Sequence, residues 1–560
     1  MDAILQTPVD GFRFDNGPSG SCCKPRNNLE SGFTCFKESE SQSLSSPTER
    51  STLCSDNYPV LKYINDMLME EDLEEQSCML QDSLALKAAE RSFLEALQED
   101  QPTSGSPEES STRRYRHRDD DEEDNRKSKL PAISVVNELA EKLEEVLLVC
   151  QKNNQGEATP NKPGRAKGSL NRSKPEQPVD MRSLLMQCAQ AVASFDQSRA
   201  FEKLKEIREH SSSHGDATQR LGYHLAEALE ARITGTMKKT TPVETDVLSK
   251  TPMVDILKAY KEFVLTCPTL IMCYNTSNRT IFELASKATT TLHIIDFGVL
   301  YGFQWPCLIQ ALSTRQGGPP KLRVTGIELP QTGFRPSERV EETGRRLKRF
   351  CDKFNVPFEY SFITKNWDTI TLDELVINSG ETTVVNCILR LQYTPDETVS
   401  LNSPRDTVLK LFRDINPDLF VFAEINGTYN SPFFLTRFRE AMFHCSALFD
   451  MFESTISEEK DCRSLLETEL IVKDAMSVIA CEGAERFARP ETYKQWQVRL
   501  LRAGFRPAKL KKHILKEGKE LARERYHKDF VVDNDNHWML QGWKGKVLYA
   551  LSFWKPAKKQ

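Results

Sequence analysis

The stretch LHIIDFGVLYGFQWP, residues 292–306, decides the fold. It begins as a short apolar run that ends in Asp296 and then enters a turn that contains two glycines. Apolar residues at helical spacing follow, in WPCLIQALSTR (305–315). A buried strand, a glycine-containing turn and a helix in this order are typical of the first unit of a doubly wound α/β sheet.

Four more apolar strands are predicted after this unit, at 319–330, 356–363, 382–389 and 417–426. Helices are predicted at 338–355, at 404–416 and, as the last one, near 491–502. Continuous apolar strands that alternate with helices indicate a parallel sheet covered on both faces. FVVDNDNHWML (530–540) and VLYALSFW (547–554) are expected to form an antiparallel pair that closes the sheet. The predicted fold class is α/β, with a Rossmann-like core sheet of the methyltransferase type.

The composition changes near residue 180. Residues 1–180 contain none of the six Trp and only five of the 29 Phe, and their net charge is −12, whereas residues 181–560 carry +6. An acidic segment with few aromatic residues cannot bury enough apolar surface to offset the entropy lost on ordering. We therefore expect a long disordered acidic arm with short amphipathic segments at 1–180. It precedes a body at 181–560, with a leucine-rich helical cap at 181–285 and an α/β core at 286–560.

Acidic and apolar residues interleave in two segments of the arm, YPVLKYINDMLMEEDLEE (58–75) and residues 82–99. Helices are predicted near 58–75, 84–98 and 133–150. Such helices fold either in the apolar groove of a partner, which we favour, or against the protein's own body. The partner-binding candidates are Leu61, Ile64, Leu68, Phe93 and Leu97. Leu184 and Leu185 in MRSLL (181–185) resemble an LxxLL recognition helix, although an ordinary buried helix is the stronger interpretation.

Two basic clusters lie in the arm, RRYRHR (113–118) and KPGRAKGSLNRSK (162–174). Basic clusters in flexible chain serve as nuclear-import signals or contact nucleic acid, and a charge-balanced linker is the alternative. The import candidates are Arg113, Arg114, Arg116 and Arg118.

The turn after the first strand is the one place that suggests a cofactor. A nucleotide-type cofactor requires glycines there and an acid after the second strand, a position that Glu328 occupies. However, Leu300 stands between Gly298 and Gly302, where its side chain would intrude on the cofactor and a positive φ is disfavoured. We therefore expect no cofactor and no catalytic residue.

Metal sites and membrane segments are not expected either. The 15 Cys show no metal-ligand spacing and are interpreted as reduced thiols of an intracellular protein. No apolar run is long enough for a transmembrane helix, and the N-terminus lacks the features of a signal peptide.

Several motifs together resemble the plant GRAS family. LHIID (292–296) is similar to the VHIID motif of that family, with Leu in place of Val. The resemblance continues through residues 333–347, 436–452 and 480–505, and it ends in GWKGKVLYALSFW (542–554), at the place of the SAW motif. The arm resembles the acidic arm of one scarecrow-like subfamily. The motif positions, expected mainly to hold the fold, are His293, Asp296, Gly298, Gly302, Arg437, Arg439, Glu440, Trp538, Trp543 and Trp554.

This resemblance implies a nuclear transcription regulator of a plant, and not an enzyme. Its expected partners are other transcription factors and the transcription machinery, with the acidic arm in a coactivator role. Direct DNA contact and a homo- or heterodimer remain open, and no membrane is involved. The alternatives are an S-adenosylmethionine-dependent methyltransferase, against which Leu300 counts, and a protein-only scaffold. The positive charge of the body mildly favours DNA contact over the scaffold.

Overall fold

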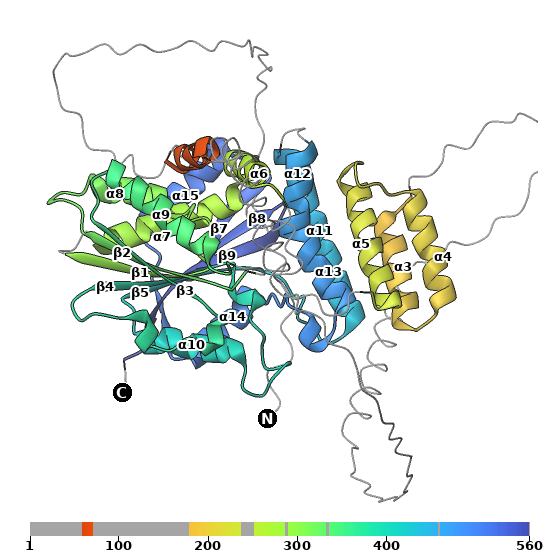
Figure 1. Ribbon diagram of the computed structural model, residues 1–560. Helices are drawn as coiled ribbons and strands as arrows, with labels where there is room; N and C mark the ends of the chain where they lie inside the picture. Colours follow the sequence, from red (N-terminus) through yellow and green to blue (C-terminus); the bar gives the residue numbers. More distant parts are fainter. Residues whose placement is uncertain are drawn as a thin grey trace, which may run out of the picture. The chain divides into compact units, whose positions relative to one another are not determined.

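A nine-stranded sheet organises the described chain (Figure 1). The computed structural model describes residues 59–70, 179–236, 251–285, 289–331, 335–456 and 460–558. The strand order is β3-β2-β1-β4-β5-β9-β8-β7, and β6 pairs with β9. The five strands β1 to β5 are parallel, which confirms the predicted parallel sheet. Their bounds are Thr291–Phe297, Lys321–Glu328, Phe358–Thr364, Thr382–Ile388 and Leu419–Ile425.

Helices cover both faces of the sheet (Figure 1). One face carries α7 (Pro268–Ala285), α8 (Trp305–Ser313), α9 (Glu338–Lys353) and α15 (Lys512–Arg525), and the other carries α10 (Pro404–Ile415) and α14 (Tyr493–Arg502). Alternate residues of a strand point to opposite faces. In β1, Ile294 accordingly packs in the core under the first group of helices, and Ile295 packs in the core under the second.

The antiparallel part of the sheet differs from the prediction. FVVDNDNHWML holds two strands, β7 (Phe530–Asp535) and β8 (Trp538–Trp543), joined by a turn at Asn536, where φ is 54°. Asn tolerates this left-handed conformation better than most residues, so the apparent single strand is a hairpin. β9 (Lys546–Pro556) and the short β6 (Phe505–Ala508) complete the sheet. The helix near 491–502 was predicted to be the last one, but α15 follows α14.

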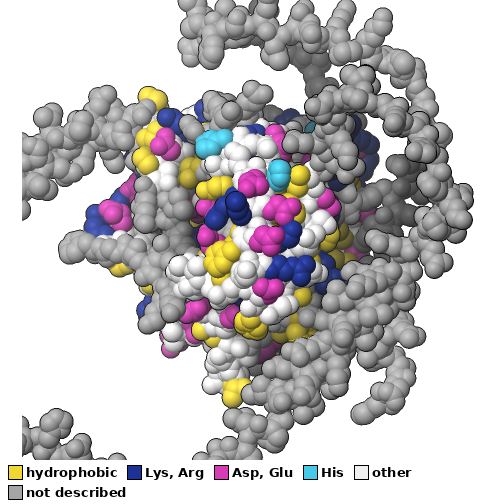
Figure 2. All heavy atoms as spheres, turned by 90° about the vertical axis from the view of Figure 1, so that its right-hand side faces the viewer, with side chains coloured by type: hydrophobic (Ala, Val, Ile, Leu, Met, Phe, Trp, Pro, Cys, Tyr) yellow, Lys and Arg dark blue, Asp and Glu magenta, His cyan; other side chains and the backbone are white. Residues whose placement is uncertain are grey.

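A group of helices stands beside the sheet. It contains α3 (Met181–Ala193), α4 (Gln197–Glu209) and α5 (Ala217–Thr234), each begun by an aspartate whose side chain accepts from backbone N–H groups of the first turn. From much later in the chain, α11 (Phe434–Thr455), α12 (Lys460–Glu467) and α13 (Lys473–Ala480) lie between this group and the sheet, and α12 packs against α6 (Met253–Thr266) (Figure 1). The sequence did not predict the three helices α11, α12 and α13. On the face seen in Figure 2, basic and acidic side chains are interspersed.

Part of the acidic arm also lies within the described chain. Residues 59–70 form an α-helix, which confirms the helix predicted near 58–75. The helices predicted near 84–98 and 133–150 lie outside the described residues, as do Phe93, Leu97 and both basic clusters. In the described ranges, no helix is long and apolar enough to cross a membrane. All nine cysteines in those ranges are free.

Candidate functional site

The carboxyl ends of β1 and β4 mark the place where doubly wound sheets bind their ligands, because the strand order reverses between these two strands. The polar side chains at this edge are Asp296, Glu328, Asn386 and Arg390. We call this region the carboxyl edge. Its arrangement decides whether the sheet can accept a nucleotide-type cofactor.

Glu328, the acid that such a cofactor would use, is engaged in an ion pair within the protein. Arg390 Nη2 donates to Glu328 Oε1 at 2.7 Å, and the backbone N–H of Leu300 donates to Glu328 Oε2 at 3.3 Å. Glu328 is only 2% exposed. Both of its carboxylate oxygens are therefore engaged within the protein and shielded from solvent, whereas a ribose hydroxyl would need access to one of them.

The glycine turn makes room for the Arg390 side chain. Gly298 has φ 101°, and a Cβ at this position would lie 2.6 Å from Cγ of Arg390. Leu300 adopts φ 47°, a conformation expected to be disfavoured, and Thr343 Oγ1 donates to its carbonyl at 2.6 Å. Leu300 packs partly buried against the core. With Arg390 packed against Gly298 and paired with Glu328, the residues present do not fit a bound S-adenosylmethionine. The sequence did not predict this part for Arg390.

Asp296 and His293 do not act together. Asp296 accepts from Trp305 Nε1 at 2.9 Å and from Asn386 Nδ2 at 2.8 Å, and burial raises its pKa to about 7. His293, an odd number of residues away, hydrogen-bonds Thr325 at 2.9 Å instead. Burial, with the charge of Arg323, lowers the pKa of His293 to about 4, so the ring is neutral. Its surroundings are those of a structural histidine.

The segment after β4, residues 389–393, is fastened to two buried carboxyl groups. The backbone N–H of Leu391 donates to Glu424 Oε1 at 2.9 Å, and the Tyr393 hydroxyl donates to Asp474 Oδ2 at 3.2 Å. Burial raises the pKa of Glu424 to about 8 and that of Asp474 to about 7. These contacts hold Arg390 across the carboxyl edge.

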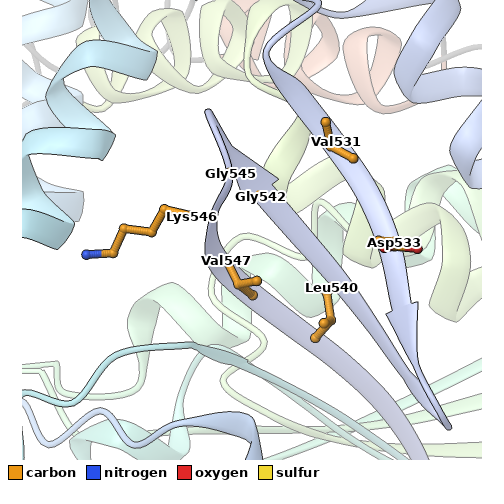
Figure 3. Close-up of a pocket in the computed structure, with 7 residues that line it drawn as sticks. All are labelled: Val531, Asp533, Leu540, Gly542, Gly545, Lys546 and Val547. Carbon is orange, nitrogen blue, oxygen red and sulfur yellow. The ribbon is translucent and has the colours of Figure 1, made fainter. Parts of the chain in front are cut away.

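A hollow on the β7–β9 side offers no convergent chemistry. Its lining comes from Val531, Asp533, Leu540, Gly542, Gly545, Lys546 and Val547. In Figure 3 the two charged residues, Asp533 and Lys546, lie on opposite sides of it, and the Lys546 side chain extends away from the strands. Among the described residues no cluster of His, Cys, Asp or Glu could hold a metal ion.

The remaining motif positions lie within the fold. Arg437 is fully buried and donates to the Val478 carbonyl at 2.8 Å, while Arg439 and Glu440 are half-buried. Each of the three motif tryptophans is buried, and its indole N–H donates a hydrogen bond: Trp538 to Gln497, Trp543 to Asp450 and Trp554 to Ser552. Leu184 and Leu185 are buried in the core. MRSLL therefore begins a helix whose apolar side, with Leu184 and Leu185, is buried in the body.

The helix at 59–70 lies on the body with its apolar side buried. Val60, Tyr63, Ile64 and Met67 are each at most 2% exposed, and Leu61 and Leu68 pack partly buried against the same core. Tyr63 donates to the Tyr301 carbonyl at 3.1 Å. Its ring meets the rings of Phe303 and Phe350 edge-on, with centroids 6.3 and 5.6 Å apart. Of the two interpretations of this segment, the structure has the helix docked on the protein's own body.

Ion pairs border the apolar contact. Arg349 Nη2 lies 2.7 Å from Glu70 Oε2, and Lys353 Nζ lies 2.7 Å from Asp66 Oδ2. Arg346 Nε lies 3.6 Å from Glu70 Oε2. We call the receiving surface the α9 face; it consists of Tyr301, Phe303, Arg346, Arg349, Phe350 and Lys353.

Comparisons with known proteins fit this architecture. Residues 181–555 match the model of the GRAS domain family. The chain belongs to the GRAS domain family. Over its full length it is 78% identical to Scarecrow-like protein 30 of Arabidopsis thaliana, with all of that protein covered. It is 65% identical to Scarecrow-like protein 11 of the same plant, over 100% of this chain and 99% of that protein.

Structural similarity agrees with the family. The crystal structure of SCL7 in Oryza sativa matches with a TM-score of 0.58 and 24% identity, over 67% of this chain and all of that one. This GRAS protein therefore shares its fold with the solved structure of SCL7.

Proposed function

We propose that this GRAS protein is a nuclear transcription regulator that acts through DNA, through DNA-binding partner proteins, or through both. The observation that carries the proposal is its similarity over the whole body to a family of plant regulatory proteins. The Arg390–Glu328 pair across the carboxyl edge supports a role without cofactor chemistry. The runner-up, a methyltransferase, would need this pair to open.

The acidic arm is proposed as an activation segment, at 58–98. Its acids keep the free segment soluble and speed its encounter with a basic partner. Leu61, Ile64, Leu68, Phe93 and Leu97 supply the apolar contacts, each worth roughly 1.5–3 kcal/mol if fully buried. Fusion of 58–98 to a foreign DNA-binding domain should activate a reporter, and changing these five residues to Ala should abolish that activity. A silent wild-type fusion would show that the segment does not activate.

Direct DNA contact is proposed for a basic surface around β6. Its cations come from the end of α14, from β6 and the residues after it, and from the end of β9: Arg502, Arg506, Lys509, Lys512 and Lys555. Arg506 lies opposite Lys555 in the β6–β9 ladder. None of the five pairs with an acid in the described part of the chain. Unpaired cations on neighbouring elements suit the DNA backbone, because each contact to a phosphate releases a counterion.

Anisotropy of labelled duplex DNA with the pure full chain tests this surface. The Arg506→Glu, Lys509→Glu and Lys555→Glu triple variant should weaken binding about equally on all sequences and flatten the salt dependence. The control is Lys321→Glu on β2, a lysine that already pairs with Glu359. Equal binding by the triple variant and the wild type would remove this surface from the proposal.

The choice between direct and partner-mediated action needs binding in cells and in solution. Chromatin occupancy in plant cells is mapped and compared with binding of the pure protein to the occupied sequences. Occupied sites that the pure protein also binds indicate direct action, and occupied sites that it ignores indicate recruitment by a partner. If the protein is found at no chromatin sites, the proposal that it is a transcription regulator is refuted, and the alternative of a protein-only scaffold is favoured.

A further inference from the structure

The docked helix and the proposed activation segment use the same apolar side of the helix. Of the proposed activation contacts, Ile64 is buried against the body, and Leu61 and Leu68 pack partly buried against it. A partner groove would have to receive this same apolar side, because the opposite side of the helix presents Asn65 and Met69 to solvent. Docking on the body and docking on a partner therefore exclude each other.

The helix at 59–70 is short enough for its docking on the α9 face to be reversible. A helix of the length of 59–70 is marginal in water on its own, so its folding depends on the surface it meets. Residues 71–178 separate it from the start of the body. A partner with a suitable apolar groove can compete under these conditions.

The charges of the α9 face match the acids of the segment. Arg349 and Lys353 pair with Glu70 and Asp66, and these are acids that the proposed activation segment also uses to approach a basic partner. The α9 face thus offers both the apolar surface and the cations that are expected of a protein that binds an acidic activation segment.

We propose that the α9 face masks the activation segment: 59–70 docked in cis is withheld from partners, and release from the α9 face makes it available. This inference rests on the proposed activating function of 58–98. The occupant of the α9 face is the chain's own helix, and the partner is a protein with a basic-rimmed apolar groove that competes for it.

The test compares fusions to a foreign DNA-binding domain in a reporter assay. The mask predicts that the full chain activates less than 58–98 alone. It also predicts that the Arg349→Glu, Lys353→Glu double variant of the full chain activates several-fold more than the wild type, because each exposed ion pair contributes a factor of about 1.5 to 5 to an equilibrium constant. Neither substitution changes a residue of the segment itself.

The matched control is the Arg345→Glu, Lys348→Glu double variant. It makes the same charge change on the same helix, but these cations pair with Glu342 and Asp352. It should behave like the wild type. Hydrogen exchange on the full chains reads docking directly: protection of the 60–70 amides should fall in the Arg349, Lys353 variant and persist in the control.

The outcomes separate the two proposals. A silent 58–98 fusion refutes the activating function, and the mask with it. An active 58–98 fusion beside a wild-type full chain that is equally active, with 60–70 still protected, refutes the mask alone. Loss of protection in the double variant without a rise in reporter activity refutes it as well.

Discussion

Removal of the Arg390 guanidinium should destabilise the body, because it leaves Glu328 as a buried carboxyl group without its cation. The Glu328 side chain is 3% exposed and that of Arg390 is 20% exposed. Loss of one partner of a fully buried pair costs about 3–5 kcal/mol. Since the guanidinium retains some contact with water, we expect Arg390→Ala to lower the free energy of unfolding by about 3 kcal/mol, near the low end of that range.

The assay is urea denaturation of the full chain followed by tryptophan fluorescence. All six Trp lie after residue 180, so the signal reports the body alone. The double variant Glu328→Gln, Arg390→Met replaces the pair with groups of similar volume and should recover most of the loss. The control Arg345→Ala removes an exposed cation paired with Glu342 and should change the free energy of unfolding by less than about 1 kcal/mol.

A loss below about 1 kcal/mol in Arg390→Ala, with no recovery in the double variant, would refute the reasoning. It would mean that Glu328 finds water or another partner, and that the pair does not close the carboxyl edge.

Three further predictions concern import, cofactor binding and pH. Changing Arg113, Arg114, Arg116 and Arg118 to Gln together with the basic residues of 162–174 should leave a fluorescent fusion cytoplasmic; unchanged nuclear accumulation would mean that import uses another signal. Calorimetry of the full chain with S-adenosylmethionine should give no binding heat, and micromolar binding lost in Asp296→Ala without unfolding would overturn this. Because burial raises the pKa of Asp474 to about 7, its contribution to stability is greatest below about pH 4 and is lost as the pH rises to 7. The stability of Asp474→Asn relative to wild type should therefore increase by about 1 kcal/mol per unit between pH 5 and 7, and parallel pH profiles would contradict it.

The parallel strands could be predicted because each is a short run, largely apolar in β1, β4 and β5 and mixed with polar residues in β2 and β3, set between helical patterns. The hairpin at Asn536 could not, since β7 and β8 read as one strand until the turn is recognised. Such patterns identify an element and its apolar side, but not the surface that covers it.

The two most informative contacts are long-range. Tyr63 reaches the Tyr301 carbonyl across 238 residues, and Arg390 reaches Glu328 across 62. The sequence predicted the amphipathic helix at 58–75, but it did not decide between a partner and the body. Arg390 follows a strand as an ordinary polar residue would, and nothing local indicates that it packs against Gly298 and pairs with Glu328. Gly298 was the available signal, since its missing side chain is what lets Arg390 pass.

The central claim, that this GRAS protein regulates transcription, is tested most directly by nascent RNA sequencing after induced nuclear entry of the full chain with translation blocked. The account predicts prompt changes in transcription at genes whose promoters the protein occupies. The same genes should respond to a chain that carries Asp296→Asn, because the account gives Asp296 no part in a reaction or in cofactor binding. Unchanged nascent RNA at occupied promoters would contradict it.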